Sequence, residues 1–178
     1  MKYQIDQSGK IEDTGRNTVL AYSNSKQYSI FISKKIKRQV QEILRKHGFI
    51  RLYIYLTFGI ALYFLIKELK QPKKIIIDRE YPGKEELIKT IVCKLLDYHK
   101  KPSHDLNFDK IGNRPKVHYA AKDVFDKKVK ADKNISLEDI LKELKMTDGR
   151  LRGCLSTLVD AQPRSINKQY HNKGKKSR

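Results

Sequence analysis

The stretch KIIID at residues 74–78 decides the fold class. It is a short, continuous apolar run of the kind that forms a parallel strand buried on both faces. Gln71-Pro72 precedes it and Tyr81-Pro82-Gly83 follows it, and both segments punctuate regular structure. Because such a strand needs helices on either side, we expect an α/β protein with a mixed sheet.

Upstream of this strand, the pattern predicts a three-stranded meander followed by a helix. Apolar residues alternate with polar ones from Tyr3, and two further strands are expected at residues 18–22 and 28–32. Ser33 is a good N-cap for a helix from Lys34 to His47, which ends at Gly48.

The uncharged stretch from Leu52 to Ile66 allows two interpretations. We expect a strand at residues 51–56 running into a buried helix at about 58–70, because Gly59 interrupts the run. A membrane-spanning helix is the alternative, but it needs about 20 apolar residues and this stretch is shorter.

Downstream, the elements continue to alternate and then the composition changes. A helix is expected at about residues 84–98, a strand at 106–111 and a helix after Pro115. We therefore expect an α/β domain at residues 1–130, a small helical extension at 131–162 and a basic, disordered tail at 163–178.

The charge of the chain points to a polyanionic partner. Lys and Arg number 39 against 20 acidic residues, a formal net charge of +19. An excess of this size attracts phosphate backbones, so we expect nucleic acid as the partner. The two cysteines, Cys93 and Cys154, form neither a zinc motif nor a disulfide framework, which predicts a reducing, cytoplasmic location.

Three polar residues are expected to meet when the chain folds. Asp6 lies in the first strand, Asp78 closes the strand quoted above, and His118 begins the helix after Pro115. If the two strands are neighbours, the carboxyl groups should lie roughly 4–8 Å apart, close enough to share metal ions. Two such carboxylates repel unless a divalent cation neutralises them, which predicts Mg²⁺ or Mn²⁺. Asp123 is the alternative third ligand; it lies about 140° from His118 around the helix, so only one can reach a shared metal.

The motifs around these residues resemble the ribonuclease H-like superfamily. The matching segments are Ile5–Gly9, Ile77–Tyr81, Ile111–Asn113 and Val117–Ala121, within residues 1–128. The order of strands and helices is similar too. The resemblance implies a nuclease in which Asp6 and Asp78 hold two metal ions, with His118 in the position of the final acid, as in the Argonaute branch.

Two features depart from the superfamily pattern. Glu42 is the only candidate for the helix-borne glutamate of ribonuclease H, and an extra strand and helix are expected at residues 51–70. A non-catalytic nucleic-acid-binding protein or regulator on the same fold is therefore the alternative function.

A second resemblance concerns residues 136–158, which look like the helix-turn-helix core of winged-helix domains. Its second helix, expected to start at Met146, would present Arg150 and Arg152 to a groove. A two-helix clamp against the main domain is the alternative. The expected nucleic-acid contacts are Lys35, Lys37, Arg38, Arg114, Arg150, Arg152, Lys173, Lys175 and Lys176.

Overall fold

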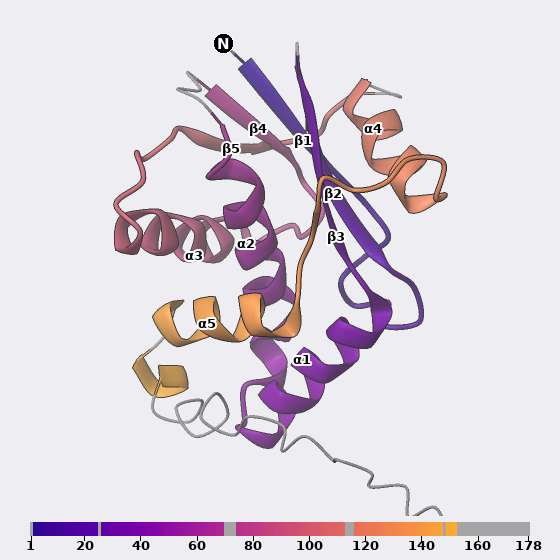
Figure 1. Ribbon diagram of the computed structural model, residues 1–178. Helices are drawn as coiled ribbons and strands as arrows, with labels where there is room; N and C mark the ends of the chain where they lie inside the picture. Colours follow the sequence, from indigo (N-terminus) through magenta and orange to yellow (C-terminus); the bar gives the residue numbers. More distant parts are fainter. Residues whose placement is uncertain (1, 25, 70–73, 113–115, 148, 153–178) are drawn as a thin grey trace, which may run out of the picture.

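The protein is built on a six-stranded mixed sheet in the order β5-β4-β1-β2-β3-β6 (Figure 1). The computed structural model describes residues 2–24, 26–69, 74–112, 116–147 and 149–152. The strands are β1 (Lys2–Ser8), β2 (Thr18–Ser23), β3 (Gln27–Ile32), β4 (Lys74–Asp78), β5 (Leu106–Asp109) and β6 (Lys133–Asn134). The first three form the expected antiparallel meander, while β4 runs parallel to β1 and to β5.

Helices cover both faces of the sheet, but unequally (Figure 1). They are α1 (Lys34–Lys46), α2 (Tyr53–Ile66), α3 (Glu85–Tyr98), α4 (Lys116–Phe125) and α5 (Leu137–Thr147). On one face α2 packs on β2 and β3, and α1, α3 and α5 pack around α2. On the other face α4 packs on β1, β2 and β3. The α/β class and the mixed sheet flanked by helices are therefore confirmed.

Strand alternation sorts the residues of the sheet between these two faces. Ile5 and Ile77 belong to the large core beneath α2, whereas Val19 and Ala21 belong to a small core beneath α4. Since successive side chains of a strand point to opposite faces, Asp6 and Asp78 lie on the α4 side.

The expected strand at residues 51–56 is wrong. Residues 50–52 form a 3-10 turn, η1 (Ile50–Leu52), and α2 then runs without a break from Tyr53 to Ile66. Nearly every side chain of α2 is buried, because the sheet and the three neighbouring helices surround it. A helix buried all round shows no amphipathic period, so its aromatic, strand-like beginning was misleading. No helix among the described residues is both long and apolar enough to cross a membrane.

The C-terminal segment shares the main core within the described residues. β6 pairs with β3, and Ile140, Leu144 and Leu151 are fully buried in the large core. The boundary expected at residue 130 is therefore not a break in the packing. Met146 and Thr147 end α5 instead of starting a second helix; residues 149–152 are helical, and the rest of the expected extension and the tail lie outside the described residues.

A first prediction tests the contact between α2 and α3. A Cβ atom at Gly59 would lie 2.7 Å from Cγ2 of Ile91, so only glycine lets the two helices approach this closely. Although alanine is the better helix former, we expect Gly59→Ala to lower the free energy of unfolding by about 1–3 kcal/mol, through overpacking. Urea unfolding measures this change.

Gly149→Ala is the matched control, because no heavy atom lies within 4 Å of the corresponding Cβ position in that helical segment. It should leave stability unchanged or raise it. Combining Gly59→Ala with Ile91→Ala, which removes Cγ2, should cost less than the sum of the two single losses, because they share one contact. If Gly59→Ala were as stable as the wild type, this would contradict the close approach of α2 and α3.

Candidate metal centre

The pairing of β1 with β4 brings Asp6 and Asp78 together. Ile5 stands opposite Ile77 in the parallel register, so the next residues of the two strands are also neighbours. One carboxylate oxygen from each of Asp6, Asp78 and Glu80 lies within 4.8 Å of the other two. The expected proximity of Asp6 and Asp78 is therefore confirmed, and the cluster sits at the carboxyl end of both strands, where open α/β sheets place their ligands.

Asp6 is the buried member of this cluster, with 7% of its surface exposed. Its Oδ1 accepts the backbone N–H of Gln7 at 2.7 Å, and its Oδ2 lies 3.0 Å from Nδ1 of His118. Burial raises the pKa of Asp6, and the charge of Asp78 raises it further, while the bonds from Gln7 and His118 act in the opposite direction. The site thus holds a carboxylate in an environment that disfavours its charge.

Glu80 is the member that the sequence reasoning missed. Its backbone N–H donates to the carbonyl of Asp78 at 2.9 Å, in a turn that folds it back beside the strand end. Burial, followed by the charges of Asp78 and Asp6, raises the pKa of Glu80 to about 7. The sequence carries no strand-period signal for Glu80, because β4 ends at Asp78 and this turn sets the position of Glu80.

Of the two candidate third ligands, only His118 lies beside the cluster, where it contacts Asp6; Glu80, and not His118, completes the group of mutually close ligand atoms. His118 lies on α4, which packs across β1, and its ring reaches Asp6. Asp123 is one and a half turns further along α4; it pairs with Lys128 at 3.1 Å and lines a separate hollow with Ser29 and Asp132. Asp123 cannot reach the cluster because it lies about 140° around the helix from His118.

The loop between β1 and β2 forms a wall near the cluster, and a buried lysine supports it. Gly9, at φ +75°, turns the chain where a Cβ would lie 2.2 Å from the carbonyl oxygen of Asn17. Lys37 of α1 is completely buried, and its ammonium donates to the carbonyls of Lys10 and Asp13 and to Oγ1 of Thr18. Burial lowers the pKa of Lys37 to about 8. The expected nucleic-acid contact at Lys37 is therefore wrong.

The same loop is tied to the residue that follows Glu80. The hydroxyl of Tyr81 donates to Oε2 of Glu12 at 3.0 Å and accepts the N–H of Ile11 at 3.3 Å. Tyr53 of α2 donates to the carbonyl of Ile11. These bonds fix the loop and the turn after β4 relative to each other, and so fix the approach to the carboxylates.

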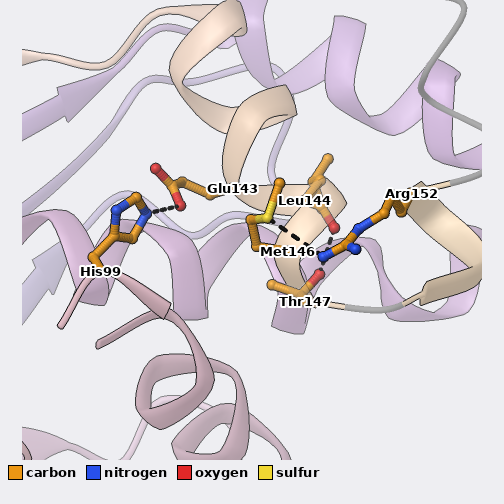
Figure 2. Close-up of polar contacts among 6 residues, drawn as sticks. All are labelled: His99, Glu143, Leu144, Met146, Thr147 and Arg152. Carbon is orange, nitrogen blue, oxygen red and sulfur yellow. Dashed lines mark hydrogen bonds and ion pairs between the residues drawn. The ribbon is translucent and has the colours of Figure 1, made fainter. Parts of the chain in front are cut away.

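The remaining candidate nucleic-acid contacts have different surroundings. Lys35 and Arg38 are exposed on α1, where Arg38 also donates to the carbonyl of Thr14. Arg150 and Arg152 are exposed too; the guanidinium of Arg150 lies over Phe49, and that of Arg152 donates to Sδ of Met146 (Figure 2). Arg114, Lys173, Lys175 and Lys176 lie outside the described residues.

The face of the sheet that carries the cluster is accessible at β4 and β5. Ile76, Asp78 and Asn107, which share this face by strand alternation, are part-exposed, whereas every residue of β2 is buried. An extended ligand therefore has access to the carboxylates from this side of the sheet.

The donor set fits a hard divalent cation. Carboxylate oxygens are the ligands that Mg²⁺ and Mn²⁺ prefer, and Mg²⁺ is commonly held by one or two carboxylates plus phosphate oxygens. Three carboxylates this close together, one of them buried, repel one another in the absence of a cation. The residues present therefore fit the metal that the strand positions predicted.

Comparisons with known proteins identify no relative of this chain. No family model matches the chain, and neither a curated protein nor a solved structure matches it.

A second prediction follows from the raised pKa of Glu80. Between pH 4.5 and about 7 the carboxyl is protonated in the metal-free fold but ionised in the unfolded chain, so its contribution to stability is lost as the pH rises through this window. Glu80→Gln, which cannot ionise, should match the wild type near pH 4 and be more stable at pH 8. We expect a gain on the order of 1 kcal/mol, reduced by partial exposure and screening.

Thermal or urea unfolding at the two pH values, in the presence of a chelator, tests this. Glu86→Gln, which changes an exposed carboxylate of α3, is the control and should show no gain at pH 8. A Glu80→Gln variant less stable than the wild type at pH 8 would show that the cluster does not strain the metal-free fold.

Proposed function

We propose that this chain is a metal-dependent nuclease whose core is related to the ribonuclease H-like superfamily. The observation that carries the proposal is the cluster of Asp6, Asp78 and Glu80, with ligand atoms within 4.8 Å of one another in a chain of net charge +19. Phosphodiester cleavage uses closely spaced carboxylates to position divalent metals, and a strongly basic chain attracts the phosphate backbone.

The arrangement of the elements supports the superfamily relationship. A meander is followed by β4 and β5, each running parallel to its neighbour, with a helix after each. The sequence was expected to depart from the superfamily pattern by an extra strand and helix at residues 51–70. That departure is smaller than expected, because residues 51–66 are helical and add no strand. The other remains: Glu42 is exposed and pairs with Arg45, whereas Glu80 supplies the third carboxylate of the cluster.

The chain's own residues have distinct roles in this proposal. Asp6, Asp78 and Glu80 would hold Mg²⁺ or Mn²⁺, which supplies charge neutralisation to the phosphodiester. His118 orients Asp6 through Nδ1, and the backbone N–H of Ile111 orients Asp78 by donating to its Oδ1 at 2.9 Å. Such bonds fix the rotamers of metal ligands and tune their basicity.

The exposed face of α1 is the best candidate for backbone contacts near the site. Lys34, Lys35 and Arg38 occupy its first two turns and are exposed. The backbone N–H of Lys34 donates to Oδ1 of Asn17, and Arg38 donates to Thr14, so the helix start is bound to the loop that borders the cluster. Positive charge on this face would attract a strand toward the carboxylates.

A non-catalytic nucleic-acid-binding protein is the second candidate, and one observation favours it. Both oxygens of Asp6 and one oxygen of Asp78 already accept hydrogen bonds from the protein. A cluster satisfied in this way can serve a structural role without a metal. Metal-dependent cleavage separates the two candidates.

A third prediction is made for the cleavage reaction. Asp6→Asn and Asp78→Asn should each lower the rate of metal-dependent cleavage by at least about 100-fold, because each removes a charged ligand worth several kcal/mol in the transition state. The assay uses a panel of labelled RNA, DNA and hybrid substrates, with Mg²⁺, with Mn²⁺ and with a chelator.

Asp123→Asn is the matched control, since it removes a carboxylate from the same face of the protein but outside the cluster. It should cleave at the wild-type rate. Cleavage by Asp6→Asn at the wild-type rate would place the reaction elsewhere, and no cleavage by the wild type on any substrate would favour the non-catalytic candidate.

A fourth prediction concerns binding of nucleic acid. The double variant Lys35→Ala/Arg38→Ala should flatten the slope of log affinity against log salt by about 1–2 units, since each phosphate contact on a duplex contributes about 0.9. Lys94→Ala, which removes an exposed charge from α3, is the control and should leave the slope unchanged. Fluorescence anisotropy over a salt series gives both slopes, and equal slopes for the three proteins would remove α1 from the interface.

A further inference from the structure

A second charged hollow lies on the other side of the sheet from the carboxylate cluster. It is a hollow of about 360 Å³ formed by the end of α2, the residues after α3, β6 and α5. Because α2 packs on the sheet face opposite α4, the sheet separates this hollow from Asp6 and Asp78. A single small ligand therefore cannot contact both sites.

The inner wall of this α2–α5 hollow is rigid and aromatic. Tyr63 and Phe64 of α2 are almost completely buried, and the ring of His99 stacks on Tyr63 at 5.2 Å. His99 is held from its other side by Glu143 of α5, whose Oε2 lies 2.7 Å from Nε2 (Figure 2). Since Glu143 is only 3% exposed, the wall is fixed by a contact inside the protein and does not depend on a ligand.

Two lysines project over this wall from different elements. The ammonium of Lys67, at the end of α2, lies 4.5 Å from the centroid of Phe64, and that of Lys133, on β6, lies 4.9 Å from the same ring. The two positive groups therefore share one aromatic ring, and the charge of Lys133 acts on Lys67. Burial and the charge of Lys133 lower the pKa of Lys67, as expected where like charges meet in a partly dry site.

The acidic residues of the hollow, Glu68, Asp139 and Glu143, oppose this lowering of the pKa of Lys67, but none of them forms an ion pair with it. Glu143 is bound to His99, and Oδ2 of Asp139 accepts both the N–H and the hydroxyl of Ser136 at 2.9 Å. The other oxygen of Asp139 is 3.9 Å from Lys133. Within the part of the chain that the structure describes, the Lys67 ammonium has no carboxylate within ion-pair distance. Lys101 and Lys142 add two more positive charges to the lining.

We propose that the α2–α5 hollow binds a phosphate group between Lys67 and Lys133. A compact anion with several acceptor oxygens satisfies converging ammonium donors and removes their mutual repulsion. The group belongs either to a free polyphosphate or nucleotide, or to a nucleic-acid strand. The inference stands apart from the proposed nuclease function, because none of these residues belongs to the carboxylate cluster.

Inorganic triphosphate is the first probe. Titrated into the full chain at constant ionic strength and followed by calorimetry and thermal unfolding, it should bind and raise the melting temperature. Lys67→Met and Lys133→Met should each weaken binding by about tenfold or more, the usual effect of losing one charge-assisted hydrogen bond. Lys26→Met, which removes an exposed lysine outside the lining, should bind within about twofold of the wild type.

Two oligonucleotides of one sequence, with a 5′-phosphate and a 5′-hydroxyl, identify the source of the group. Tighter binding of the phosphorylated strand, lost in Lys67→Met, indicates a terminal phosphate, whereas an equal loss for both strands indicates a backbone phosphate. All of these affinities are measured with a chelator present, so that a metal ion held by the carboxylate cluster cannot contribute, which separates this site from the nuclease proposal. No binding of triphosphate at millimolar concentration, or binding that Lys67→Met and Lys133→Met leave intact, overturns the inference. Lys101→Met replaces either variant if circular dichroism shows that it is unfolded.

Discussion

The parallel ladder between β1 and β4 is the constraint on which the candidate site depends. It joins two strands far apart in the sequence and sets Ile5 opposite Ile77, both buried in the large core. The alternation of side chains then places Asp6 and Asp78 on the other face, side by side. A shift of one residue in either strand would send its aspartate into the apolar core and its isoleucine to the surface, so burial of the isoleucines specifies the position of the carboxylates.

The two faces of the sheet differ in what they expose because helices cover them differently. Beneath α2, four helices enclose a continuous apolar core that includes all of the buried isoleucines of β3 and β4. On the opposite face α4 packs on β1, β2 and β3, and β4 remains part-exposed at Ile76 and Asp78. The core supplies stability that offsets the repulsion within the carboxylate cluster, whose charged form is disfavoured by its own surroundings. Proteins commonly place destabilising polar groups at sites where they act on a ligand.

The sequence predicted the parts of the fold that have a clear period or a clear cap. The meander, β4 and the start of α1 at Ser33 follow from alternation, an apolar run and an N-cap whose hydroxyl does accept the N–H of Ile36. The strand expected at residues 51–56 and the missed strand β6 share one cause: tertiary packing, and not the local sequence, determines the secondary structure there. The run from Tyr53 is helical because it is surrounded on all sides, and a uniformly apolar segment carries no period by which to recognise it. The two-residue β6 has no sequence signal at all.

The candidate site was predictable in its strand residues and less so elsewhere. Asp6, Asp78 and His118 were identified by their places on expected elements; the structure brings Asp6 and Asp78 together and places His118 against Asp6. Glu80 was not, since its position depends on a turn formed after the strand ends. Lys37 was assigned to the surface, although its spacing to Val40 and Leu44 is that of a buried helix face, and those two residues are buried beside it. A charged residue on such a face is kept there by acceptors from a distant loop, which a helical pattern does not reveal.

The most direct test of the account is to locate the metal itself. Crystals of the protein grown or soaked with Mn²⁺, with diffraction data collected to give anomalous signal, would show whether the cluster is a metal centre. The account predicts an anomalous peak coordinated by carboxylate oxygens of Asp6, Asp78 and Glu80, with distances typical of oxygen ligands. Full Mn²⁺ occupancy at another position, with Asp6 still bonded only to Gln7 and His118, would contradict it.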